Sequence, residues 1–400
     1  MKIAFAYFER FIDMSGGIER VCCNLANALT ARGHEVSIVY CFGRSGRPFY
    51  ELDDRVRLYN LMAIHPEKWK KEALGQCLSG SAKLVRECIR VVNGNRARDW
   101  NEKAKGRMIE EEIQQVMQEI MPDVILSFRY ETSNYLLNFA RVSSPVITMF
   151  HMDPAFIVPK MPAGEITAIQ KSAAAQVLLK HDIPVVEKYC PGANVVWIPN
   201  AVPQYDRQAD LRSVKEHYKI IHAARLNKAQ KRQHLLVEAF ARLAGEFPEW
   251  TVELWGGGDE SGAPYAEELR ALIREYHLQE RVFLKGESRH ISDEYATADI
   301  FCFPSAYEGF PLAMTEAMSA GLPVVVYRSC TAAAELIRDG TDGFLAEDGA
   351  EGLADTLKKL MENQQLRSDM GAAARIAMRD YQPERIWDMW EGLISQVMNK

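Results

Sequence analysis

The sequence predicts an α/β protein built from two Rossmann-like domains. Three observations predict this fold. The chain has 400 residues, which is more than one hydrophobic core usually holds. Short apolar runs alternate with helical patterns almost throughout, as in repeated βα units. A polar stretch from Pro203 to about Lys215 interrupts this alternation, which then restarts. Such domains bind ligands at the carboxyl ends of their strands, so we expect a site in a cleft between two facing domains.

The first domain is expected to span residues 1–205. Its apolar runs show no polar face, which is typical of strands in a parallel sheet that helices cover on both sides. A helix over residues 17–32 has one apolar face, and Gly33 ends it. The strands are expected at residues 2–8, 35–42, 55–61, 123–128, 145–150, 175–179 and 195–199.

The second domain is expected to span residues 206–382 and to repeat the pattern. Its strands are expected at residues 219–224, 250–255, 282–285, 299–304, 323–327 and 343–345. Its helices are expected at residues 233–247, 265–276, 311–320, 331–337, 351–362 and 365–379. A last helix over 383–398 contains Trp387 and Trp390. We expect residues 383–400 to cross back and pack on the first domain; a helix that stays on its own domain is the alternative.

Composition argues against several classes of function. The net charge of −6 gives no global reason to expect nucleic-acid binding. The eight cysteines include no CxxC pair, which predicts reduced, buried thiols in a cytoplasmic protein. No run of about 18 apolar residues could span a membrane, and the apolar start of the chain is too short for a signal peptide.

The densest motif covers residues 305–318, where a strand is followed by a loop and a helix. Pro311 suits the first turn of this helix, because its missing N–H would be unpaired there anyway. The N–H groups of Leu312 and Ala313 then offer a seat for phosphate at the positive end of the helix dipole. Gly309 lets a ligand approach the backbone.

Two glutamates belong to the same motif. Glu308 lies in the loop, and Glu316 lies further along the helix on an otherwise apolar face. A carboxylate on such a face is costly unless it meets a hydroxyl or a cation, and a ribose diol meets that need. The alternative is a pair of solvated glutamates beside a core helix.

A second motif supplies positive charge. Arg225 and Lys231 directly follow the first strand of the second domain. At the carboxyl end of that strand both side chains could converge on a diphosphate, Arg225 as a fork and Lys231 as a point charge. The alternative is that these basic loop residues are only solvated.

Further motifs follow in a fixed order along the chain. They are Gly16-Gly17-Ile18-Glu19-Arg20, Ile198-Pro199-Asn200-Ala201-Val202, Gly256-Gly257-Gly258-Asp259, Gly321-Leu322-Pro323-Val324-Val325, and Glu335-Leu336-Ile337 with Asp339-Gly340 and Gly343. Together with Arg225, Lys231 and the Glu308–Glu316 pair, this set resembles glycosyltransferase family 4, the retaining GT-B enzymes that use nucleotide-diphospho-sugars. The chain departs from the family at Ala201, Ala224, Arg232 and Pro311, where glycine is common.

The resemblance implies a role for each matching residue in the second domain. Arg225 and Lys231 would neutralise the leaving diphosphate. Glu316 would bind the ribose hydroxyls, and Glu308 would touch the donor sugar and support positive charge at its anomeric carbon. Other donor-binding residues would be Gly286, which meets the base, and the loop and helix start formed by Gly309, Phe310, Pro311, Leu312 and Ala313.

The resemblance also implies contacts from the first domain. Gly16 and Gly17 would approach the phosphate or the acceptor from a helix start. His151, which follows a strand, would face the sugar and the acceptor; a purely structural histidine is the alternative. Asn200 is a weaker candidate for the donor site.

The implied reaction is retaining hexosyl transfer. The donor would be a UDP-sugar or a GDP-sugar. The acceptor would be a glycan or a lipid-linked glycan of a cell-surface polysaccharide, such as lipopolysaccharide or capsule. No Asp-x-Asp pair is present to hold a metal at the diphosphate, so we expect a metal-independent site without another cofactor. The alternatives are a nucleotide-sugar epimerase, a phosphorylase or a non-catalytic partner subunit of similar fold.

The basic segment 65–107 stands apart in charge. It carries eleven lysines and arginines against five acidic residues, a net charge of +6. One helical face collects the apolar residues Leu84, Val85, Cys88, Ile89 and Val92 beside the basic residues Lys83, Arg86 and Arg90. A basic amphipathic helix can lie on anionic lipid, here at the inner face of the cytoplasmic membrane. The alternative is an ordinary helix that packs on the first domain with a solvated basic rim.

Overall fold

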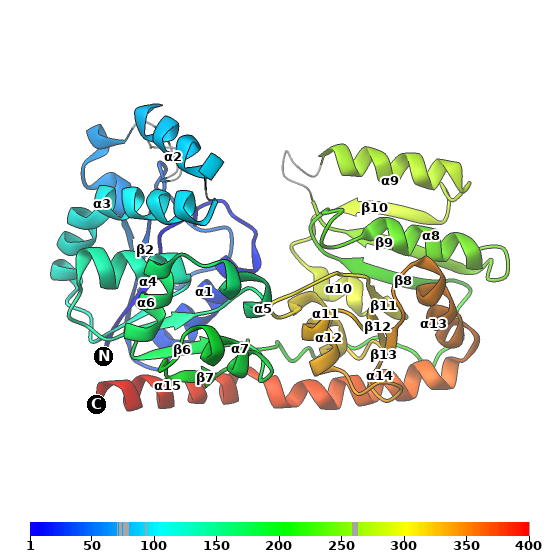
Figure 1. Ribbon diagram of the computed structural model, residues 1–400. Coiled ribbons are helices and arrows are strands. Elements are labelled where there is room, and N and C mark those ends of the chain that lie inside the picture. Colours follow the sequence, from blue (N-terminus) through cyan, green and yellow to red (C-terminus); the bar gives the residue numbers. More distant parts are fainter. Residues whose placement is uncertain (70, 72–73, 75–79, 93, 258–262, 400) are drawn as a thin grey trace. The chain divides into compact units, whose positions relative to one another are not determined.

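The computed structural model describes the chain apart from residues 70, 72–73, 75–79, 93, 258–262 and 400 (Figure 1). It divides into two compact units. The first comprises Met1–Asn200 and Ile386–Lys400, and the second comprises Ala201–Arg385. Each unit holds one parallel sheet, which confirms the predicted α/β class. Gly258, Asp259 and part of the basic segment lie outside the described residues.

A seven-stranded parallel sheet forms the first unit, in the order β3-β2-β1-β4-β5-β6-β7. Every strand expected in this half is present, with slightly shorter bounds. The strands are β1 (Lys2–Tyr7), β2 (Glu35–Tyr40), β3 (Arg57–Asn60), β4 (Val124–Ser127), β5 (Val146–Met149), β6 (Ala174–Val177) and β7 (Val195–Trp197). All residues of β4, β5 and β6 are buried, because helices cover both faces of the sheet.

Helices connect these strands. They are α1 (Gly17–Ala31), α2 (Gly80–Val92), α3 (Gly94–Ile120), α4 (Tyr130–Asn134), α5 (Pro154–Ile157), α6 (Ala163–Lys171) and α7 (Asp182–Tyr189). A π-helical turn at Tyr135–Ala140 continues α4, and short 3-10 turns lie at Leu61–Ala63, Pro66–Lys68 and Val158–Lys160. The helix α3 was not among the expected elements. Its 27 residues are mostly polar, yet it buries Ile109, Ile113 and Val116.

The second unit repeats the architecture with a six-stranded parallel sheet in the order β10-β9-β8-β11-β12-β13. Its strands are β8 (Tyr218–Ala223), β9 (Trp250–Trp255), β10 (Val282–Gly286), β11 (Ile300–Phe303), β12 (Val324–Tyr327) and β13 (Gly343–Ala346). Its helices are α8 (Gln233–Leu243), α9 (Ala263–Glu275), α10 (Ile291–Tyr295), α11 (Leu312–Ser319), α12 (Thr331–Leu336), α13 (Ala350–Glu362) and α14 (Gln364–Met378), with a 3-10 turn at Arg379–Tyr381. Trp250, Phe240 and Leu357 are among its fully buried core residues.

The chain ends in α15 (Pro383–Met398), most of which belongs to the first unit. Its buried face includes Ile386, Trp390 and Ile394. Arg32, at the end of α1, donates to Asp388 at 2.7 Å and to Glu391 at 2.5 Å. The helix is thus attached to the first unit by both apolar packing and ion pairs. Among the described helices, none is both long and apolar enough to cross a bilayer.

Candidate functional site

The carboxyl edge of the second unit's sheet collects the predicted donor-site residues. Parallel strands end at the same edge, so the loops after β10, β9, β8 and β11 are neighbours there. Arg225 and Lys231 follow β8, Gly286 ends β10, and Glu308 follows β11. Glu316 lies on α11, the helix that begins after the Glu308 loop.

Lys231 and Glu308 form an ion pair between two of these loops. The Lys231 ammonium donates to Glu308 Oε1 at 2.5 Å, and the two side chains are only 13% and 9% exposed. The ammonium also lies 5.1 Å from the ring centroid of Phe303. The loops are joined through their backbones as well, since the Ala306 N–H donates to the Gln230 carbonyl at 2.7 Å. Folding therefore places a cation and a carboxylate, 77 positions apart, at one point of the edge.

Arg225 is an exposed cation of the same edge. No ion pair of its guanidinium occurs within the described part of the chain. Its backbone is fixed, because the Gln233 side-chain amide donates to the Arg225 carbonyl at 2.9 Å. Lys228, in the same loop, pairs instead with Glu268 at 2.5 Å on the surface. Arg225 can therefore meet an incoming anion, and its planar fork suits a diphosphate.

Gly256 allows the ends of β8 and β9 to approach each other. Its φ is +131°, and an added Cβ would lie 1.9 Å from the Ala224 carbonyl oxygen. Its N–H donates to the carbonyl of Gly286 at 2.7 Å, and Gly286 also has a positive φ of +74°. A side chain would be strained at both positions. The contact of Gly286 with the base stays a prediction.

The start of α11 differs from the expectation. Pro311 precedes the helix rather than occupying its first turn, with φ −76° and ψ 77°. These angles form an inverse γ-turn, in which the Leu312 N–H donates to the Phe310 carbonyl at 2.9 Å. Leu312 is therefore not a free donor, contrary to the sequence-based prediction. Among the described residues, the N–H groups of Ala313 and Met314 have no acceptor, so the predicted phosphate seat is displaced by one residue.

Glu316 and Phe310 are both buried at this helix. Glu316 is 2% exposed and lies among the buried Met314, Ala317 and Met318. Phe310 is 7% exposed, and its ring centroid lies 6.0 Å from that of Tyr381. Phe310 thus anchors the Gly309 loop by packing.

In the first unit, Gly16 and Gly17 begin α1 as expected. The carboxylate of Glu19 folds back on this turn: an added Cβ at Gly16 would lie 2.2 Å from Glu19 Oε2. The Tyr7 hydroxyl donates to the other oxygen of Glu19 at 2.8 Å. Sequence reasoning assigned no role to Tyr7 or Glu19. Their bond explains why the turn needs glycine, because the buried carboxylate occupies the space of a side chain.

His151 follows β5 and stacks on Phe128, with ring centroids 5.4 Å apart and planes at 9°. Its Nε2 is buried and has no hydrogen-bond partner in the described part of the chain. Burial, helped by the charge of Arg129, lowers the pKa of His151 to about 3. The imidazole is therefore neutral near pH 7 and can offer one hydrogen bond but no positive charge. Asn200, the other expected residue of this unit, is buried after β7.

A carboxyl group that the sequence analysis did not single out lies deep in the first unit. Glu165 on α6 is fully buried, and neither of its oxygens has a hydrogen-bond partner among the described residues. The Arg98 guanidinium on α3 lies 3.7 Å away. Burial raises the pKa of Glu165 to about 8, with a further contribution from the charge of Glu131. Arg98 and Glu165 are 67 positions apart in the sequence, so the local sequence pattern could not indicate their contact.

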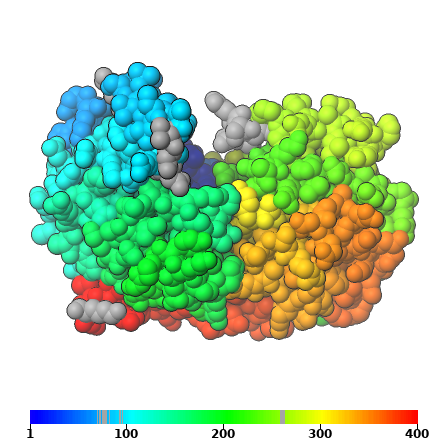
Figure 2. All heavy atoms as spheres, in the orientation of Figure 1, coloured from blue at the N-terminus to red at the C-terminus, as the bar shows by residue number. Residues whose placement is uncertain are grey.

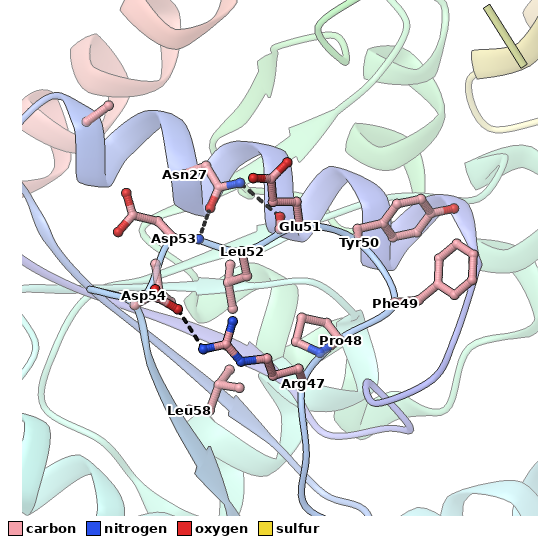
Figure 3. Close-up of a pocket in the computed structure, with 12 residues that line it drawn as sticks. Asn27, Arg47, Pro48, Phe49, Tyr50, Glu51, Leu52, Asp53, Asp54 and Leu58 are labelled. Atoms are coloured by element: carbon pink, nitrogen blue, oxygen red, sulfur yellow. Dashed lines mark hydrogen bonds and ion pairs between the residues drawn. The ribbon is translucent and has the colours of Figure 1, made fainter. Parts of the chain in front are cut away.

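A pocket of about 880 Å³ lies on the flank of α1 in the first unit (Figure 3). Asn27 holds its rim: the side-chain amide donates to the Glu51 carbonyl at 3.0 Å and accepts from the Asp53 N–H at 2.8 Å. Arg47 pairs with Asp54 at 2.8 Å. Three carboxylates against one guanidinium make the lining acidic, which disfavours a phosphate ligand. The lining of this pocket therefore does not suit a diphosphate.

Comparison with known proteins gives two family matches that follow each other along the chain. Residues 15–203 match Glycosyltransferase Family 4, and residues 205–377 match Glycosyl transferases group 1. Among curated relatives, an uncharacterized glycosyltransferase of Haemophilus influenzae is 24% identical over 98% of this chain and 99% of its own. The amylovoran biosynthesis glycosyltransferase AmsD of Erwinia amylovora is 24% identical over 96% of this chain and 97% of its own.

Solved structures agree on the fold. The crystal structure of Anabaena HepE in complex with UDP and glucose has a TM-score of 0.72 at 19% identity, and the match covers 99% of both chains. Staphylococcus aureus TarM, in a complex that contains UDP, has a TM-score of 0.74 at 15% identity and covers 98% of this chain and all of its own. With its two parallel sheets and both family matches, the chain belongs to glycosyltransferase family 4, the retaining, metal-independent, nucleotide-sugar-dependent enzymes of GT-B fold.

Proposed function

We propose that this enzyme transfers a hexose from a UDP-sugar, with a GDP-sugar as the second choice, to a glycan or lipid-linked acceptor of cell-surface polysaccharide or glycolipid synthesis. The choice of UDP is supported by the UDP in the HepE and TarM complexes. The choice of acceptor class is supported by the amylovoran enzyme among the relatives. Both assignments come from these proteins and are proposals for this chain.

The observation that carries the proposal is the set of positive groups at one sheet edge. Arg225 is exposed, Lys231 lies beside the sugar-facing candidate Glu308, and the N–H groups of Ala313 and Met314 are free among the described residues. A diphosphate offers an oxygen to each of these donors. Removing the charge of Arg225 or of Lys231 should therefore weaken binding of the nucleotide.

The proposed chemistry follows from the charges that develop. The bond between the anomeric carbon and the β-phosphate oxygen breaks, and negative charge collects on the diphosphate. Arg225, Lys231 and the α11 N–H groups would stabilise that charge in place. The acceptor oxygen bonds to the anomeric carbon on the same face, and its proton passes to the leaving phosphate oxygen. The Glu308 carboxylate would stabilise the positive charge on the sugar, while Glu316 would hold the ribose.

The first unit would contribute hydrogen bonds rather than charge. Because His151 stays neutral, its Nε2 would bind a hydroxyl of the sugar or the acceptor, and it would not act as a cationic acid. Gly16 and Gly17 would approach the phosphate or acceptor through their backbone, and Asn200 would make a minor donor contact. A lipid-linked acceptor would bring the enzyme to the inner face of the cytoplasmic membrane, where the basic segment 65–107 would contact lipid.

Isothermal titration with UDP tests the proposal, with EDTA present to remove free metal. Lys231→Met should weaken UDP binding by about tenfold or more, because a charge-assisted hydrogen bond is lost. Lys228→Met is the matched control: it removes a lysine from the same loop whose ammonium is paired with Glu268. Equal affinities for the wild type and Lys231→Met would refute the diphosphate assignment.

A further inference from the structure

The helix α2 turns its apolar face outward. Leu84 is 70% exposed, Val85 46% and Val91 89%, and Cys88 beside them is also exposed. Residues 84, 88 and 91 follow the three-and-four spacing of a single helical face. Single exposed apolar residues are ordinary, but a cluster on one helix marks an interaction surface. The helix also packs on α3, as the alternative from the sequence expected, but its apolar side chains Leu84, Val85 and Val91 lie in solvent.

Basic side chains occupy an adjacent side of the helix. Lys83 and Arg90 are exposed, and Arg86 and Arg90 both donate to Glu87, at 2.6 Å and 3.2 Å. Three basic residues against Glu87 leave the helix with a net charge of +2, in a protein whose net charge is −6. Positive charge therefore gathers on the one described helix that also exposes a cluster of large apolar side chains.

Much of the remaining charge in the basic segment is used inside the protein. Lys68 pairs with the buried Glu112 at 2.7 Å, and Lys105 pairs with Glu102 at 2.8 Å. The Lys68–Glu112 pair joins the start of the segment to α3, whereas the Lys105–Glu102 pair lies within α3 itself. The net charge of the whole segment is therefore larger than the charge available to bind a lipid surface. The apolar face of α2 has to supply a large part of any attachment to that surface.

The position of α2 leaves its outward face open. Figure 1 shows α2 beyond α3 at the tip of the first unit, on the side away from the sheet, and Figure 2 shows atoms of this segment at the outer rim of the unit. A second copy of the chain is a poor occupant, because a stable protein interface needs about 800 Å² from each partner and this face is one side of a helix of 13 residues. A bilayer with anionic headgroups matches both the apolar face and the basic side.

We propose that α2 is a membrane anchor that lies in the plane of an anionic bilayer. Leu84, Val85 and Val91 would enter the boundary between headgroups and acyl chains, while Lys83 and Arg90 would meet lipid phosphates. The anchor would place the enzyme at a membrane, where a lipid-linked acceptor is found. Only this link to the acceptor rests on the proposed function. Attachment itself requires neither a donor nor transfer.

Flotation of the full-length protein with vesicles tests the anchor. One set of vesicles contains phosphatidylglycerol and phosphatidylcholine in equal parts, and the other contains phosphatidylcholine alone. The test variant is Leu84→Glu with Val91→Glu, which places charge on the apolar face. The matched control is Val214→Glu with Ile376→Glu, which changes two exposed apolar residues of the second unit, 84% and 58% exposed. UDP titration of each variant confirms that the donor site is intact.

The wild type and the control should float with the phosphatidylglycerol vesicles and stay behind with phosphatidylcholine alone. The test variant should lose about tenfold in bound fraction, because attachment depends on buried apolar area. Wild type that fails to float, or a test variant that floats like wild type, would overturn the anchor while UDP binding still supports the proposed function. Sedimentation of wild type as a dimer that the test variant abolishes would also overturn it, by assigning the face to a second copy.

Discussion

Replacing Glu308 by glutamine should tighten the binding of UDP while it suppresses sugar transfer. The Glu308 carboxylate holds the Lys231 ammonium at 2.5 Å, and both side chains are nearly buried. A diphosphate has to compete with this carboxylate for the ammonium. Glutamine keeps the shape of the side chain but removes its charge, so the ammonium is released to the ligand.

The magnitude follows from the bond that is released. A hydrogen bond to a charged group contributes about 1.5–3 kcal/mol, and regaining half of the upper value gives about 1.5 kcal/mol, or roughly tenfold tighter binding. Lys231→Met acts in the opposite sense on UDP. It also leaves Glu308 buried without its cation, which should lower the free energy of unfolding by about 3 kcal/mol. Combining the two changes should restore most of that stability.

Isothermal titration with UDP and urea unfolding of the wild type, both single variants and the double variant give the full cycle. Titration with UDP alone isolates the diphosphate from the sugar that Glu308 would face. If Glu308→Gln weakened UDP binding as much as Lys231→Met, the carboxylate would not compete for the ammonium, and the reasoning from the ion pair would be refuted.

Three further predictions concern other parts of the chain. Arg225→Ala should weaken UDP binding about tenfold in the same titration, whereas Lys228→Ala should not change it; similar losses in both would mean that only general loop charge matters. Gly256→Ala should lower the free energy of unfolding by roughly 3 kcal/mol, because its Cβ would meet the Ala224 carbonyl at 1.9 Å, while Gly392→Ala on an open side of α15 should raise it by up to about 1 kcal/mol; an undisturbed Gly256→Ala in urea unfolding would contradict the close approach. Because burial raises the pKa of Glu165 from 4.5 to about 8, the folded chain binds more protons than the unfolded chain between these values, and its stability should fall as the pH rises. Glu165→Gln should flatten that slope in urea unfolding at pH 5 and pH 8, and an unchanged slope would assign it to another group.

Most of the fold was predictable because the sequence of each strand or helix carries the pattern of that element. The runs that became β4, β5 and β6 are apolar on both faces, and this pattern is typical of buried parallel strands. The helix α3 was not predicted because most of its residues are polar and only a narrow stripe of apolar residues is buried. For α2 the sequence predicted the amphipathic face but not its direction, since a pattern of apolar residues does not say which side a neighbour covers.

The candidate site was predictable as a set of residue types and not as a set of contacts. Arg225, Lys231, Glu308 and Glu316 were predicted from strand ends and motif spacing. The Lys231–Glu308 ion pair joins loops from different strands, so its partners could not be matched from the sequence. The inverse γ-turn at Pro311 depends on the ψ angle of this residue, which the sequence does not indicate.

The local sequence also does not show which polar groups of the first unit are buried. Glu19, Tyr7 and Glu165 look like ordinary surface or strand residues in the sequence. Only the packed structure shows that Glu19 is held by the Tyr7 hydroxyl and that Glu165 lacks a hydrogen-bond partner within the described residues. The free-energy cost of burying such a group depends on contacts with residues that are distant in the sequence.

A thermal-shift screen of the full-length enzyme against UDP, GDP, ADP and their sugars, run in EDTA, tests the central claim most directly. We predict that UDP and UDP-sugars raise the melting temperature, because a ligand that binds only the folded state stabilises it. The shift should shrink in Lys231→Met and in Glu316→Ala, which remove the proposed diphosphate and ribose contacts. A melting temperature that no nucleotide changes would contradict the claim that Arg225, Lys231, Glu308 and Glu316 form a nucleotide-sugar site.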